Sequence, residues 1–110
     1  MFVVRARWCQ SYFCRLRGLM FSPGLAPETG LLIVQPSMGV SQTAIHMWFV
    51  FFSLGVVWLD DEYRVVDKKL AKPWRIYAPK AAARYILEGR PELLEKVKIG
   101  DKLDIAPSSD

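Results

Sequence analysis

The longest apolar run in this chain, Ile45–Asp67, limits the folds that the chain can adopt. It holds two of the four tryptophans, and its only break is the acidic triplet at residues 60–62. Taken as one helix, residues 44–59 would span about 24 Å, which is short of the roughly 30 Å hydrocarbon core of a bilayer. Trp, Phe, Val and Ile dominate the run, and these types favour a pleated surface. The run therefore predicts buried strands and no membrane span.

Apolar alternation divides this run into two central strands and a third that follows them. In residues 45–50 and 54–59 apolar side chains fall on both faces, so both faces are expected to be covered. Ser53 and Gly55 indicate a turn or bulge between these two strands. The acidic triplet then turns the chain into a third predicted strand at residues 63–69.

The flanking segments add shorter elements. The pattern predicts further strands at residues 2–8, 30–35, 84–88 and 103–105. Two short helices are predicted at residues 12–17 and 92–98. Pro73 is expected to end the sheet after the third central strand, with a loop at residues 76–80. The predicted fold is mainly β: a compact antiparallel sandwich or small barrel of about seven strands with two short helices.

Length and composition indicate one domain, residues 1–110, with a flexible tail at residues 106–110. Hydrophobic residues make up 52% of the chain, which is enough for one modest core. Lys and Arg number 15 against 11 Asp and Glu, a mild excess that fits nucleic acid or an acidic lipid surface without arguing for either. The opening residues do not read as a signal peptide, so a cytoplasmic protein with reduced thiols is expected.

Histidine and cysteine do not form a recognisable catalytic or metal site. His46 is the only histidine, and in an apolar strand it is expected to be a hydrogen-bonded core residue. Cys9 and Cys14 with His46 give three ligands where a structural zinc needs four, so both cysteines are expected to pack, with a disulfide between them left open. No cofactor or metal is expected, and the residues favour a non-enzymatic role while leaving an enzyme open.

Several motifs occur in the order found in one protein family. They are RLRGLMF at 15–21, HMWF at 46–49, VVWLD at 56–60, KPWR at 72–75, YILE at 85–88 and GDKL at 100–103. Across residues 15–105 the chain resembles the family catalogued as domain of unknown function 192. The resemblance implies a compact, mainly β domain with no assigned activity.

The chain departs from the pattern of that family at two places. Val50, Phe51 and Phe52 stand where relatives often have a polar pair, and Gly55 stands where they commonly have Asp. An activity that depends on those polar residues would be lost here.

A basic and aromatic loop supplies the candidate binding site. Trp74 beside Arg75 is typical of a ligand or partner platform, although a tryptophan that caps the core is an equally good interpretation. Glu88 ends an apolar strand and needs a partner if it is buried; the resemblance makes Arg15 or Arg17 the candidate. The predicted ligand-binding residues are Arg17, Met47, Trp48, Trp74, Arg75 and Glu88.

These residues favour a small binding or accessory domain for a small anionic or peptide-like ligand, with an unknown small ligand or protein as its partner. A hydrolase or isomerase with a site near His46 and Glu88 is the second hypothesis, and it requires an accessible His46 beside a carboxylate or hydroxyl. The third hypothesis is a nucleic-acid accessory protein that binds through four arginines, Arg5, Arg7, Arg15 and Arg17. The same arginines are also typical of the solvated face of an edge strand and a short helix.

Overall fold

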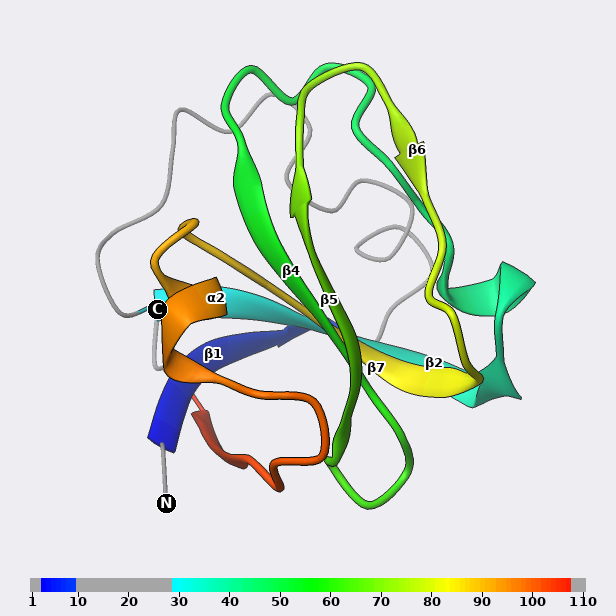
Figure 1. The fold of residues 1–110 in the computed structure, drawn as a ribbon, viewed down its shortest axis with the longest axis vertical. Coiled ribbons are helices and arrows are strands. Elements are labelled where there is room, and N and C mark those ends of the chain that lie inside the picture. Colours follow the sequence, from blue (N-terminus) through cyan, green and yellow to red (C-terminus); the bar gives the residue numbers. More distant parts are fainter. Residues whose placement is uncertain (1–2, 10–28, 108–110) are drawn as a thin grey trace.

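The computed structural model describes residues 3–9 and 29–107 and shows a six-stranded sheet with a two-stranded ribbon beside it (Figure 1). The strands are β1 (Val3–Cys9), β2 (Thr29–Gly39), β3 (Ile45–His46), β4 (Leu54–Leu59), β5 (Val65–Ala71), β6 (Ile76–Tyr77), β7 (Ala83–Gly89) and β8 (Asp104–Pro107). A 3-10 turn, η1 (Ser41–Thr43), and one short helix, α2 (Leu93–Lys96), complete the described elements. The predicted mainly β fold is confirmed.

Most strand pairs of the main sheet are antiparallel. The strand order is β5-β4-β7-β2-β1-β8, and antiparallel ladders join β5 through β2. Strand β1 lies between β2 and β8 and pairs with both in parallel. Side-chain alternation is the same in both kinds of ladder, so the sequence pattern could not distinguish the parallel pairs from antiparallel ones.

Of the two central strands predicted in the apolar run, the first is largely wrong. Only Ile45–His46 is a strand, and it pairs with β6 in the ribbon and not with β4. After Met47 the chain leaves the ladder, because the backbone turns at Phe49, whose φ is 61°. The second predicted strand is confirmed as β4, and all six of its residues are buried.

The main sheet has a core on each face, which explains why β4 is apolar on both sides. On one face Leu31, Val56 and Trp58 pack with Ile45 and Met47, which come from the ribbon and the turn after it. The opposite face packs against α2 and the segment that follows it, with Leu59, Leu87 and Val97 in its core. The ribbon and the helix therefore cover opposite faces of one sheet.

Gly55 lies where the chain that enters α2 crosses the sheet. A Cβ added at this position would lie 2.7 Å from the carbonyl oxygen of Arg90 and 3.2 Å from Cγ of Leu94. Gly55 also pairs with Gly89 of β7, which pairs with Gly30 of β2, so a row of glycines crosses three central strands. The aspartate that the family resemblance expects at this position would not fit here.

Other predicted boundaries are met in part. The third central strand begins at Val65 and ends at Ala71, before Pro73 as expected. The loop expected at residues 76–80 contains β6, and the helix expected at 92–98 is confined to α2. The helix predicted at residues 12–17 lies outside the described residues. Within the described residues, no helix has the length and apolar character to cross a bilayer.

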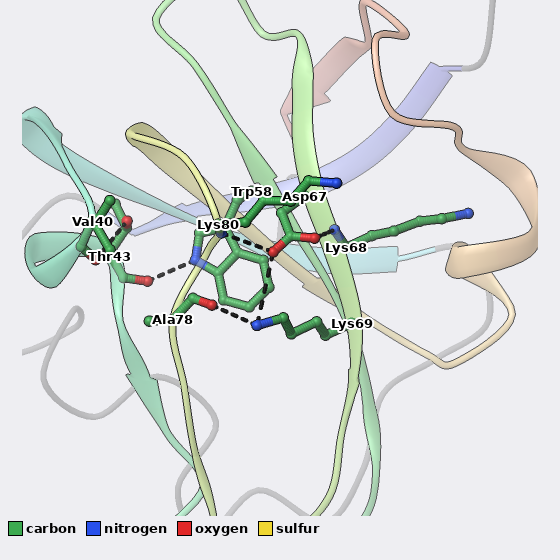
Figure 2. A network of polar contacts seen from close by, with 8 residues as sticks. All are labelled: Val40, Thr43, Trp58, Asp67, Lys68, Lys69, Ala78 and Lys80. Atoms are coloured by element: carbon green, nitrogen blue, oxygen red, sulfur yellow. Dashed lines mark hydrogen bonds and ion pairs between the residues drawn. The ribbon is translucent and has the colours of Figure 1, made fainter.

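Trp58 anchors the segment before the ribbon to the sheet (Figure 2). Its side chain is fully buried, and its Nε1–H donates a 2.7 Å hydrogen bond to the carbonyl oxygen of Thr43 in η1. The buried Thr43 hydroxyl in turn donates to the carbonyl oxygen of Gly39 at 2.8 Å. A tryptophan in the sheet and a 3-10 turn thus fix the point at which the chain enters β3.

Asp67, directly opposite Trp58 in β5, fixes the segment after the ribbon (Figure 2). Its buried carboxylate accepts a 3.0 Å hydrogen bond from the backbone N–H of Lys80. Lys69 Nζ lies 3.8 Å from the same carboxylate and donates to the carbonyl oxygen of Ala78 at 2.7 Å. The segments that enter and leave the ribbon are therefore held to β4 and β5 by hydrogen bonds.

Candidate functional site: an exposed aromatic surface

Four aromatic rings from two neighbouring turns meet at the surface around Trp74. The centroid of the Trp74 ring lies 5.1 Å from that of Phe49, 5.9 Å from Phe51 and 6.1 Å from Trp48. The planes are inclined by 50° to 73°, which brings ring edges towards ring faces, an arrangement worth about 0.5–1.5 kcal/mol per pair. These four residues are called the aromatic surface below.

The aromatic surface is open to solvent although its rings contact one another. The exposed fractions are 41% for Trp48, 41% for Phe49, 61% for Phe51 and 47% for Trp74. Ile76, which follows in β6, is 65% exposed. Grouped large apolar side chains at the surface of a soluble domain mark interaction sites, whereas scattered ones carry no such meaning.

Met47 positions this surface from below. Its side chain is buried in the core, and its backbone N–H donates to the carbonyl oxygen of Arg75 at 2.7 Å. Its own carbonyl oxygen accepts a 2.8 Å hydrogen bond from the N–H of Trp74. These bonds continue the β3–β6 ladder into the two turns and hold Trp48 and Trp74 side by side. Met47 is a supporting residue, and its side chain does not reach the surface.

Two residues of the aromatic surface have a backbone conformation that bulky side chains rarely adopt. Phe49 has φ 61° and Trp74 has φ 66°. The remaining non-glycine residue with positive φ in the described part is Tyr63, which stacks on Tyr85. A left-handed conformation costs an L-residue roughly 1–2 kcal/mol, and such strain is concentrated at functional sites.

In the described segments that build the aromatic surface, the charged side chains are all basic. Residues 44–59 and 68–87 contain no aspartate or glutamate. Lys72 and Arg75 flank Trp74 and are exposed, and neither forms a salt bridge within the described residues. The acidic triplet at residues 60–62 lies in the β4–β5 turn, at the other end of these strands (Figure 1). The surface therefore combines aromatic rings with the exposed positive charges of Lys72 and Arg75.

Glu88 is separate from this surface. It pairs with Leu31 of β2 and Val56 of β4, both of which pack in the core under the ribbon. The side chain is buried, and its Oε1 has no hydrogen-bond partner among the described residues. Burial raises the pKa of this carboxyl from 4.5 to about 7, because water no longer stabilises the charged form. Arg15 and Arg17 lie outside the described residues, so the predicted ion pair stays a prediction.

His46 and Glu88 are not brought together. In the ribbon, Ile45 and Tyr77 pack towards the core, so the paired His46 and Ile76 face outwards. His46 is half-buried on this outer side, rather than in the core as expected, and its Nδ1 accepts a 3.3 Å hydrogen bond from the N–H of Trp48. The ribbon lies between the imidazole and the Glu88 carboxyl, so the structure gives the acid–base hypothesis no support.

Of the predicted site residues, the structure brings Trp48, Trp74 and Arg75 together. Met47 supports them through its backbone, Glu88 lies in the core, and Arg17 is outside the described residues. Sequence reasoning missed Phe49, Phe51 and Ile76. One signal could have found Phe51. The family resemblance places a polar residue at this position, and a position that is polar in relatives is normally exposed.

Comparisons with known proteins bear on the family and the fold. A UPF0127 protein of Pyrococcus horikoshii is 42% identical over 99 residues, which cover 88% of this chain and 84% of that protein. A UPF0127 protein of Thermococcus sibiricus is 37% identical over 102 residues, 91% of this chain but 65% of the relative, so the chain spans less than two thirds of that protein.

Two crystal structures share the fold at low sequence identity. One is a protein of unknown function from Novosphingobium aromaticivorans, with a TM-score of 0.76 and 21% identity over 88% of this chain and 71% of that one. The other, from Sinorhizobium meliloti and described as a proposed transcription regulator, has a TM-score of 0.80 and 19% identity over 88% and 78% of the two chains. Residues 2–105 match the family DUF192, described as Uncharacterized ACR, and the chain belongs to that family.

Proposed function

We propose that this chain is a small binding or accessory domain whose aromatic surface recognises a small anionic or peptide-like ligand. The observation that carries this proposal is the positive φ of Phe49 and Trp74. The two residues are 41% and 47% exposed and lie outside the hydrophobic core. A residue such as Asn or Gly would adopt the same backbone at lower cost, which supports a role for the rings themselves.

The chemistry of the surface supports a ligand that has both an apolar and an anionic part. Exposed edges and faces of Trp48, Phe51 and Trp74 offer stacking and apolar contact to a ring or a short hydrocarbon group. Lys72 and Arg75 offer hydrogen-bond donors and positive charge to a carboxylate or phosphate. A ligand with an apolar body and one anionic group would use both. The identity of the partner and the cytoplasmic location stay predictions of the sequence.

N-acetyl-L-phenylalanine is a suitable probe because it carries one ring, one amide and one carboxylate. Its neutral counterpart, N-acetyl-L-phenylalaninamide, differs only in that charge. We expect the carboxylate to bind in the millimolar range, near −4 kcal/mol, and about threefold more tightly than the amide, as one exposed ion pair would give. Ligand-observed NMR measures both affinities.

Trp74→Asn tests the location of this binding. Asn tolerates positive φ, so the variant should keep the fold while it loses the central ring of the surface. We expect binding of both probes to fall below detection, whereas Trp8→Asn, which removes an exposed tryptophan elsewhere, should bind as the wild type does. Unchanged binding by Trp74→Asn, or equal affinity for the charged and neutral probes, would contradict the proposal.

A further inference from the structure

The aromatic surface occupies one end of the molecule along its long axis. The connection that leads into β4 and the connection between β5 and β6, which carry its four rings, both lie at the top of the view (Figure 1). The β4–β5 turn, with the acidic triplet at residues 60–62, lies at the bottom. One end of the molecule is thus aromatic and basic, whereas the other end carries the acidic triplet together with the basic residues Arg64 and Lys102.

We infer that this aromatic and basic end docks on the surface of an anionic lipid bilayer. The inference rests on the proposed function and specifies its ligand as anionic headgroups together with the interfacial layer beneath them. Tryptophan is enriched at the membrane–water interface, where its amphipathic ring sits at headgroup level. Lys72 and Arg75 beside the rings meet the negative potential of an anionic leaflet. Such docking is peripheral and requires no spanning segment.

The packing of the rings favours a lipid surface over a peptide groove. The rings of Phe49 and Phe51 lean on Trp74 with centroids 5.1 and 5.9 Å away, at interplanar angles of 65° and 73°. Rings this close fill the space between one another, so another side chain cannot enter between them. Peptide recognition relies on grooves and pockets for side chains, whereas a fluid interface adapts to a set of closely packed rings.

Charge disfavours a second copy of this chain as the partner. A symmetric dimer through this end would place each Lys72 and Arg75 near its own counterpart, because the same patch is used on both subunits. Residues 44–59 and 68–87 provide no acidic group to compensate them. An anionic bilayer satisfies the rings and the positive charges at once, and leaves the acidic triplet of the β4–β5 turn in water.

Co-sedimentation with vesicles of phosphatidylcholine alone, or of equimolar phosphatidylcholine and phosphatidylserine, tests this inference. We expect the protein to bind only the phosphatidylserine vesicles at low salt, with a blue shift of tryptophan emission, and to dissociate as salt is raised. Each basic residue near an anionic surface raises the membrane partition coefficient about fivefold. The double variant Lys72→Gln/Arg75→Gln should therefore lower this coefficient about thirtyfold.

A matched variant separates local charge from net charge. Lys98→Gln/Lys102→Gln removes the same two charges from exposed positions outside the aromatic end and should bind nearly as the wild type does. Phe51→Ala, which removes the most exposed ring of the surface, should weaken binding and reduce the blue shift.

Three outcomes would overturn the inference: equal binding to both vesicle types, equal loss in the two double variants, or concentration-dependent dimerisation that removes the blue shift. If vesicles fail while N-acetyl-L-phenylalanine still binds at Trp74, the lipid assignment falls and the proposed function stands. If both fail, the proposed function falls as well.

Discussion

Raising the pH from about 4.5 to above 7 is expected to remove about 3 kcal/mol from the free energy of unfolding, because of Glu88 alone. Burial raises the pKa of this carboxyl from 4.5 to about 7 in the folded protein. Between these values the folded state binds more protons at this group than the unfolded state, so stability falls as pH rises. Each unit of pKa difference corresponds to about 1.4 kcal/mol.

Glu88→Gln isolates this contribution. Glutamine cannot ionise, so the free energy of unfolding of this variant should fall less than that of the wild type between pH 4.5 and a pH above 7. The difference between the two falls, measured by urea unfolding, should be about 3 kcal/mol. Glu95→Gln, at an exposed position in α2, should keep the pH dependence of the wild type. If the wild type loses no more stability than Glu88→Gln as the pH rises, the charged carboxylate is stabilised in the folded protein. That result would favour the predicted pairing with Arg15 or Arg17.

Trp58→Phe is expected to lower the free energy of unfolding by about 2–4 kcal/mol. The indole is fully buried in the core under the ribbon, and the smaller ring leaves a cavity. The change also removes the donor to the carbonyl oxygen of Thr43, a buried acceptor whose loss of partner costs about 1–3 kcal/mol. Because Thr43 fixes the entry to the ribbon, the aromatic surface should become less ordered as well.

Trp8→Phe is the matched control for this substitution. Trp8 is 36% exposed and its ring lies 6.4 Å from that of Tyr63, so the same change should cost less than about 1 kcal/mol. Chemical denaturation of both variants compares them directly. A cost for Trp58→Phe no larger than that for Trp8→Phe would mean that Trp58 is not the anchor described here.

The sequence predicted best the strand that is buried on both faces. Strand β4 was predictable because its six residues are apolar on both faces, and a strand covered on both sides needs that pattern. The strand predicted at residues 45–50 was wrong beyond His46, because alternation cannot reveal a turn made by Phe49 with positive φ. Sequence rules assign such turns to Gly or Asn, and this chain uses aromatic residues instead.

The candidate site was predictable only in outline. Trp74 and Arg75 were predicted from a basic and aromatic loop, and the structure places Trp48 beside them. Phe49 was assigned to a strand covered on both faces, because apolar residues in a long apolar run are normally buried. The separation of Glu88 from Trp74 depends on strand order and on which face each residue occupies. Both are long-range properties that local patterns do not encode.

Whether Trp48 and Trp74 form a binding surface is tested most directly by the four indole N–H signals in a ¹⁵N–¹H NMR titration with N-acetyl-L-phenylalanine. The signals of Trp48 and Trp74 should shift progressively, because these rings are exposed and in contact with each other. Those of Trp58, which is buried, and Trp8, which lies elsewhere, should stay in place. Shifts at Trp8 or Trp58 with none at Trp48 and Trp74, or no shift at all, would contradict this assignment.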